Sequence, residues 1–205
     1  MGDVNQKSYL QKFHPVEDGP ILEIGSKDHG GRIDHAGTTT FRTVYSANEY
    51  VGVDLEAGKG VDYTVDLVEG IGELPENHFA LAICCSVMEH VARPWKMAEN
   101  ITRLVRPGGR LYISVPWVWR YHPYPDDYYR FSFRGIMQLF PEFDWAHIYY
   151  STTARGEFLM VKESCLGIDH LMSPNRESPE LKRKYLPYLM VNMLGTKLQT
   201  ARQAA

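Results

Sequence analysis

The chain has 205 residues, which is enough for one domain with a substantial core, so we look for a single active site. Hydrophobic residues make up 44% and charged residues 23%, values that exclude a disordered or fibrous protein. The 22 Lys and Arg residues nearly balance the 25 Asp and Glu residues and are scattered, which excludes a strongly basic nucleic-acid-binding surface. We therefore expect a small-molecule substrate and no nucleic-acid partner.

Membrane and redox signals are weak in this sequence. No apolar run reaches the roughly 18 to 20 residues that span a bilayer, and the first residues are too polar for a signal peptide. Cys84 and Cys85 are neighbours in an apolar run, where the two side chains of a strand point to opposite faces. We expect a cytoplasmic protein with reduced thiols and no membrane partner.

Short apolar runs alternate with segments of helical character, which is typical of a parallel sheet with helical crossovers. The run at 79–86 is apolar almost throughout, as expected of a central strand that is covered on both faces. The predicted strands are 20–24, 50–54, 61–66, 79–86, 109–116, 145–151 and 157–162.

Two helices can be predicted between these strands. The first covers 92–105 and ends at Pro107-Gly108-Gly109, and the second covers 131–140 and ends at Pro141. The sequence therefore predicts a Rossmann-like α/β fold, with a seven-stranded, mostly parallel sheet, helices on both faces and an antiparallel last strand pair.

The last part of the chain has a different pattern. Residues 164–205 contain three prolines, an apolar stretch at 186–194 and a polar end. We interpret 1–163 as the domain and 164–205 as a C-terminal extension, helical or loop, that docks on the domain, caps the pocket or joins two subunits in a homodimer.

A glycine-bearing turn follows the first strand. Gly25 and Gly30 match two positions of the dinucleotide fingerprint G-x-G-x-x-G, but Lys27 stands where its middle glycine lets the backbone approach a pyrophosphate. The sequence therefore disfavours a dinucleotide, although plain turn glycines would look the same.

Carboxylates end the next two strands, at the edge where ligands of open α/β sheets bind. Asp54 ends the second strand and has two oxygens that can accept both hydroxyls of a ribose, or it caps a helix or turn. Asp66 ends the third strand and can accept an adenine amino group, while Leu67 packs on the base; a plain loop carboxylate is the alternative.

Five segments in this order resemble the class I S-adenosylmethionine-dependent methyltransferases, especially the group called methyltransferase type 11. They are ILEIGS, YVGVDL, YTVDL, FALAICCSVMEHV and LVRPGGRLYISVP, and the resemblance covers about 21–140. The glycine loop departs from the family pattern G-x-G-x-G, because Lys27 and His29 occupy its second and third glycine positions.

The resemblance implies S-adenosylmethionine as the cofactor and assigns residues to its parts. Asp54 with the adjoining Leu55 would hold the ribose, Asp66 and Leu67 would frame the adenine, and Ser86 would border the sulfonium. The residues implied beside the methionine moiety are Glu23, Gly25 and Ser26.

His90 is the candidate catalytic residue. It follows the central strand at the ligand edge, and imidazole is suited to proton transfer near neutral pH. A structural role, in which the ring holds the loop through backbone hydrogen bonds, is the alternative.

The segment 116–131 is rich in aromatic, proline and charged residues and follows the fifth strand. Its motif H-x-x-P-x-D-Y-Y-R-F is similar to that of a subgroup of these methyltransferases found with glycan and other small-molecule pathways. We therefore expect this segment to form a pocket wall, or a lid packed by its own side chains. The candidate substrate-binding residues are His122, Asp126, Tyr129 and Arg130.

We predict no metal, because His90, His122, Asp126 and Asp127 lack the spacing of a ligand pair on a helix. The expected reaction is methylation of a hydroxyl, or less favourably an amine or carboxylate, of a sugar or metabolite. The rival hypotheses are a binding module without transfer activity and an NAD-binding oxidoreductase.

Overall fold

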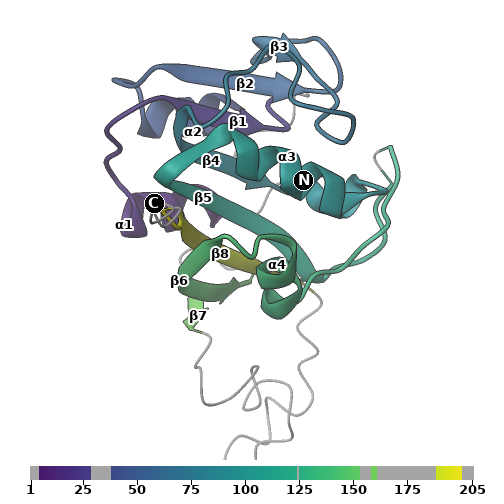
Figure 1. Cartoon of the computed structure of the whole chain (residues 1–205). Helices are drawn as coiled ribbons and strands as arrows, with labels where there is room; N and C mark the ends of the chain where they lie inside the picture. The colour runs from purple at the N-terminus through teal and green to yellow at the C-terminus, as the bar shows by residue number, and fades with distance from the viewer. Residues whose placement is uncertain (1–4, 29–37, 124, 153–157, 161–187, 200–205) are drawn as a thin grey trace, which may run out of the picture.

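The computed structural model describes residues 5–28, 38–123, 125–152, 158–160 and 188–199 (Figure 1). The helices are α1 (Gln6–Phe13), α2 (Thr38–Val44), the short 3-10 helix η1 (Met88–His90), α3 (Pro94–Leu104) and α4 (Phe133–Leu139). The strands are β1 (Ile21–Ile24), β2 (Tyr50–Asp54), β3 (Tyr63–Thr64), β4 (Phe79–Cys85), β5 (Val105–Val118), β6 (Phe143–Ser151), β7 (Phe158–Met160) and β8 (Leu189–Lys197).

The sheet has the strand order β3-β2-β1-β4-β5-β8-β6-β7. The strands from β3 to β5 are parallel, and β6 and β7 form the expected antiparallel pair. All seven predicted strands are present, and the mostly parallel Rossmann-like sheet is confirmed. Beside the seven predicted strands, the described residues form one more, β8.

The eighth strand comes from the segment that we expected to be a helix or loop. β8 lies antiparallel between β5 and β6, with Leu111 opposite Gly195 and Trp145 opposite the same glycine. A Cβ at Gly195 would lie 2.8 Å from the Trp145 ring, so only glycine lets the indole pack on the strand there. Residues 189–197 are therefore part of the sheet, whereas 161–187 and 200–205 lie outside the described residues.

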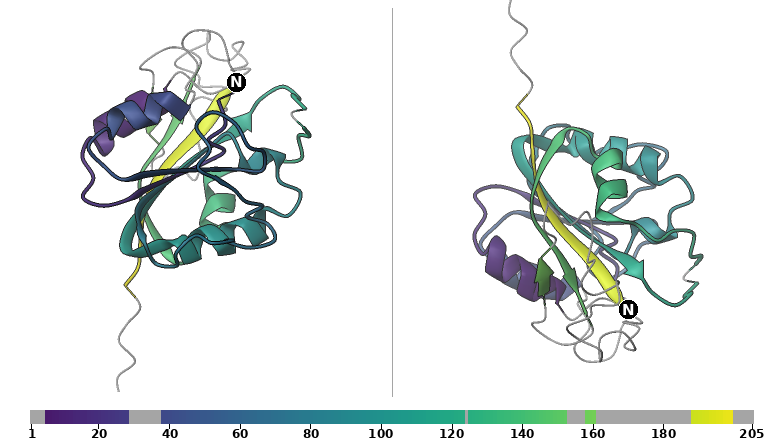
Figure 2. Two further views of the ribbon diagram at one scale, coloured as in Figure 1. Left: turned by 90° about the horizontal axis from the view of Figure 1, so that it is seen from above. Right: turned by 90° about the horizontal axis from the view of Figure 1, so that it is seen from below.

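Helices cover both faces of the sheet, as predicted (Figure 2). α1 and α2 pack on one face through Tyr9, Leu10 and Phe41. α3 and α4 pack on the other face, in the larger core that contains Ile101 and Ile136. The central strands β1 and β4 are therefore buried between the two layers of helices, and their carboxyl ends remain for ligands.

The sequence pattern did not predict α1. Its Tyr9 ring stacks on Tyr112 of β5 at 4.9 Å between centroids, so an N-terminal segment of polar appearance is anchored on the sheet. Cys84 is buried, Cys85 is half-buried, and no disulfide joins them in the part of the chain that is described. None of the described helices is long and apolar enough to cross a bilayer.

Candidate functional site

The candidate site lies where the strand order reverses, between the carboxyl ends of β1 and β4. The chain runs from β1 outward to β2 and β3, then returns to β4 on the other side of β1, and ligands of open α/β sheets bind at such a point. Gly25, directly after β1, has a φ of +75°, and a Cβ there would lie 2.4 Å from Val87 Cγ2. Glycine therefore lets the turn after β1 pack against the segment after β4.

Asp54 joins this turn to the end of β2. Its carboxylate accepts hydrogen bonds from the backbone N–H of Lys27 at 3.1 Å and of Glu56 at 3.2 Å. A carboxylate has about four lone-pair sites, so two remain for the hydroxyls of a ligand. The turn-residue and ribose-binding interpretations of Asp54 are thus compatible.

Lys27, which stands at a glycine position of the family, directs its side chain away from the turn. Its ammonium pairs with Glu56 at 2.5 Å. Its methylene carbons pack on Gly58, where a Cβ would lie 3.0 to 3.4 Å from them. The lysine side chain therefore does not cover Gly25, whose backbone N–H, like that of Ser26, donates to the carbonyl of Val53. His29, Gly30 and Gly31 lie outside the described residues.

The residues that we assigned to the adenine lie beyond β3. Asp66 is exposed, and its carboxylate accepts the backbone N–H of Val68 at 2.8 Å. Leu67 is only 3% exposed and packs in the core, whereas Leu55 after β2 is 61% exposed. Burial therefore favours Leu55 over Leu67 as the apolar contact for a base.

Glu23 is buried in β1, two residues before Gly25. The Tyr50 hydroxyl donates a hydrogen bond to its carboxylate at 2.6 Å. Burial nevertheless raises the pKa of Glu23 to about 8, because the charged form loses its hydration. The folded chain without a ligand therefore holds a proton on Glu23 at neutral pH.

This proton predicts a pH-dependent stability. Between the ordinary pKa of 4.5 and about 8, the folded chain keeps a proton that the unfolded chain has released, so stability falls as the pH rises. Glu23→Gln cannot lose a proton and still accepts from Tyr50, so we expect it to gain a few kcal/mol over the wild type at about pH 8, at about 1.4 kcal/mol per pKa unit. Urea unfolding at about pH 5 and about pH 8 checks this. Equal slopes with pH for both proteins would contradict it.

Ser86 follows β4 with a φ of +55°, and its backbone N–H donates to the carbonyl of Ser114 in β5 at 2.8 Å. Gln6 of α1 donates from Nε2 to the hydroxyl oxygens of both serines, at 3.1 Å each. The first helix thus reaches the ligand edge of the sheet. This role of Gln6 could not be predicted from the sequence, because its partners are distant along the chain.

His90 ends η1, and its Nδ1 contacts the backbone carbonyl of Asp126. A carbonyl oxygen can only accept, so Nδ1 carries the hydrogen and Nε2 presents a lone pair. Burial lowers the pKa of His90, which favours this neutral form. The ring therefore both holds the loop and offers a basic nitrogen.

Glu89 precedes His90 and is 1% exposed. Burial raises the pKa of its carboxyl to about 8. Its backbone carbonyl accepts from Tyr128 N–H at 2.8 Å, but within the described part of the chain Oε2 has no hydrogen-bond partner. Such a buried, unsatisfied oxygen costs free energy and often marks a binding site.

The loop between β5 and α4 is organised by Asp127 and Arg130. The guanidinium donates to both oxygens of this fully buried carboxylate, at 2.5 and 2.7 Å, and also to the carbonyls of Trp119 and Arg120. The pair lowers the pKa of Asp127 well below its usual range. Arg130 therefore pairs with an acid of its own loop.

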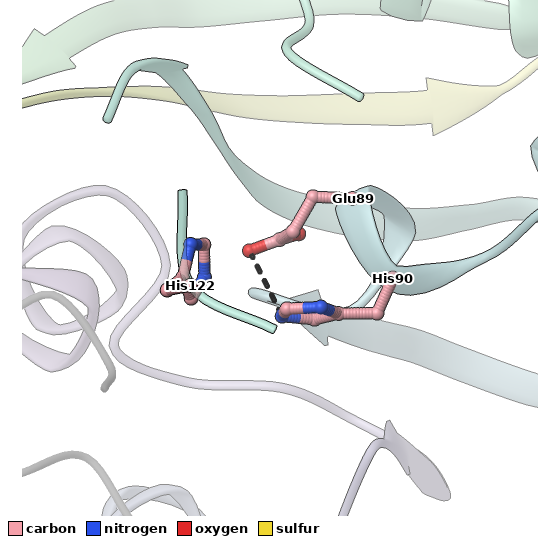
Figure 3. A group of neighbouring side chains, drawn as sticks. All are labelled: Glu89, His90 and His122. Atoms are coloured by element: carbon pink, nitrogen blue, oxygen red, sulfur yellow. Dashed lines mark ion pairs between the residues drawn. The ribbon is translucent and has the colours of Figure 1, made fainter. Parts of the chain in front are cut away.

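The predicted substrate residues come together only in part. His122 lies beside His90, with ring centroids 4.9 Å apart (Figure 3). Asp126 contributes its backbone carbonyl to His90, and its carboxylate accepts the N–H of Asp127. Tyr129 donates its hydroxyl to the Ala92 carbonyl at 3.1 Å. Asp127 was missed as a site residue, because the sequence does not show which of two adjacent acids turns inward.

The family described as "Methyltransferase domain" matches residues 36–113. The chain is 31% identical over 115 residues to a ubiquinone biosynthesis O-methyltransferase of Xylella fastidiosa, a match that covers 52% of this chain and 46% of that protein. The first three curated relatives are matched over 26% to 46% of their own lengths, so the chain spans less than half of each.

Solved structures share the whole fold at low sequence identity. A S-adenosylmethionine-dependent methyltransferase from Archaeoglobus fulgidus has a TM-score of 0.63 at 16% identity, over 93% of this chain and 92% of the other. A Burkholderia thailandensis 1,6-didemethyltoxoflavin-N1-methyltransferase, bound to its substrate and S-adenosylhomocysteine, has a TM-score of 0.60 at 15% identity, over 95% and 77%. At this level of identity, the likeness concerns the fold alone.

Proposed function

We propose that this chain, a class I methyltransferase of the type 11 group, uses S-adenosylmethionine to methylate a hydroxyl group of a small molecule. The observation that carries the cofactor assignment is the junction of Gly25 and Asp54 at the strand-order reversal. When bound, the cofactor supplies a methyl group on a positively charged sulfur.

The residues at the junction suit this cofactor. Gly25 keeps the turn free of a side chain, and Asp54 has lone pairs left for the two ribose hydroxyls. Glu23 lies buried just before the turn and would release its proton if a cationic amino group bound beside it, and Leu55 offers an exposed apolar side chain for the base. Asp66 and Ser86 stay in the proposal as contacts of the adenine and of the region of the sulfur.

The acceptor side is formed by η1 and the loop before α4. Tyr121 and Tyr128 are 66% and 49% exposed, and aromatic rings of this kind suit the faces of sugars and other rings. His90 offers Nε2 toward this side of the site, where it would act on the hydroxyl proton of the acceptor. The names of the curated relatives support a hydroxyl as acceptor, and the Burkholderia thailandensis enzyme represents the amine alternative.

The cofactor assignment is tested by calorimetry with S-adenosylhomocysteine. We expect the wild type to bind it, and Asp54→Ala to bind at least about tenfold more weakly, since hydrogen bonds to charged groups contribute about 1.5 to 3 kcal/mol each. Asp144→Ala, which removes an exposed carboxylate from β6, should bind as the wild type does.

NAD serves as the competing ligand in the same titrations. Tighter binding of NAD than of S-adenosylhomocysteine would contradict the methyltransferase proposal. Equal affinity of Asp54→Ala and the wild type would contradict the ribose assignment alone. A screen of hydroxyl compounds, with formation of S-adenosylhomocysteine as the readout, then identifies the acceptor.

A further inference from the structure

Three side chains with metal-binding atoms converge beside the loop between β5 and α4, residues 119–132, which we call the acceptor loop. Glu89 and His90 come from η1, and His122 comes from the loop that follows β5 (Figure 3). One ligand atom from each of the three lies within 4.8 Å of the other two. The group joins residues that are far apart in the sequence, which is why their spacing gave no sign of it.

Both imidazoles are held so that the same nitrogen is available. Nδ1 of His90 contacts the Asp126 carbonyl, and Nδ1 of His122 lies 3.1 Å from the Arg120 carbonyl and 3.1 Å from Asp127 Oδ2. These partners only accept, so each Nδ1 carries the hydrogen and each Nε2 presents a lone pair. Histidines that bind metals are oriented in this way, with the second nitrogen donating to a carbonyl or carboxylate.

The third member lacks the partner that a buried carboxylate requires. Glu89 is 1% exposed, Oε1 lies 3.9 Å from His90 Nε2, and Oε2 has no hydrogen-bond partner in the described residues. Burying a carboxylate without a cation or a full set of hydrogen bonds costs free energy. A cation between the carboxylate and the two imidazoles would remove that cost if the carboxylate bound it through Oε2 or through both oxygens.

We propose that Glu89, His90 and His122 bind one divalent transition-metal ion, for which Zn²⁺ is the representative. Two imidazoles and one carboxylate are a ligand set for such ions and leave at least one position for a further ligand. Ligand atoms around one Zn²⁺ are at most about 3.5 Å apart in a tetrahedral site. Binding therefore requires the three ligand atoms to approach one another by about an ångström.

The role of the ion rests on the proposed function, whereas its binding does not. An acceptor hydroxyl in the remaining position would have a lowered pKa and would lose its proton to water. His90 would then act on the acceptor through the ion and not as a free base. Compounds with an oxygen donor next to the hydroxyl would be favoured as acceptors, because two oxygens can share the open positions.

In the test, the full chain is treated with a chelator and then titrated with Zn²⁺ in a calorimeter. We expect one ion per chain, and a loss of affinity of at least about tenfold in both His122→Ala and Glu89→Gln, the usual size of ligand and supporting-residue effects. His78→Ala, which removes an imidazole that lies outside the site, should bind as the wild type does. Substitution with Co²⁺ should give a visible spectrum in the wild type that both site variants lose.

Unchanged binding in both site variants, or no binding by the wild type in the micromolar range, would overturn the metal proposal. Affinity for S-adenosylhomocysteine is measured on the same samples and confirms that the variants are folded. If the wild type binds S-adenosylhomocysteine but no metal, the proposed function stands and the metal site fails. If it binds metal but not S-adenosylhomocysteine, the reverse holds.

Discussion

His90→Ala is expected to lower kcat by about a hundredfold or more with any acceptor that the wild type methylates, while affinity for S-adenosylhomocysteine stays within a few-fold. Activation of an acceptor proton by a positioned group typically contributes at least this factor. The ring contacts Asp126 and His122 on the acceptor side, and no described hydrogen bond joins it to the turn of Gly25. Steady-state rates and calorimetry on the same variant measure the two effects.

A purely structural histidine would give a different result. The melting temperature and the affinity for S-adenosylhomocysteine would then fall together, because the hydrogen bond to Asp126 would be lost from the loop. His78→Ala is the matched control, since His78 directly precedes β4 and so lies at the opposite end of that strand from His90. Near-wild-type turnover by His90→Ala would remove the residue from the mechanism.

Arg130→Ala should destabilise the fold by about 1.5 to 3 kcal/mol, because the Asp127 carboxylate loses two hydrogen bonds from a charged donor. The Asp127 side chain is 0% exposed and accepts hydrogen bonds from both guanidinium NH2 groups, and the same arginine donates to the backbone carbonyls of Trp119, Arg120 and Tyr129. Arg130→Lys should rescue little, since an ammonium cannot reproduce the planar fork. Urea unfolding and the rate of proteolytic cleavage in the loop measure the loss.

A surface ion pair provides the control for this effect. Arg93 pairs with Glu69, but their side chains are 51% and 68% exposed, so Arg93→Ala should cost less than about 1 kcal/mol. In Arg130→Ala with Asp127→Asn, the buried charge is also removed, and part of the stability should return. A loss from Arg130→Ala no larger than that from Arg93→Ala would contradict the buried-pair account.

Local patterns determined the parallel half of the molecule. The apolar run at 79–86 forms β4, because a strand that is covered on both faces is apolar at consecutive positions. The segment before Pro107-Gly108-Gly109 forms α3, because a helix that is buried on one side has apolar residues at helical spacing. The acid that ends β2 was also correctly placed at the ligand edge, since strand ends follow from strand limits. These features depend on short-range order, and the sequence alone contains them.

Only the tertiary structure decided the partners of segments far apart in the chain. The apolar stretch near the end has no period that separates a strand from a helix, and it became β8 because β5 and β6 offered free edges on both sides. Likewise Asp127, not Asp126, turned inward to Arg130, Gln6 reached Ser86, and His122 came to lie against Glu89 and His90. These contacts depend on which buried polar groups find hydrogen-bond partners once the chain is packed, and a short stretch of sequence does not contain that information.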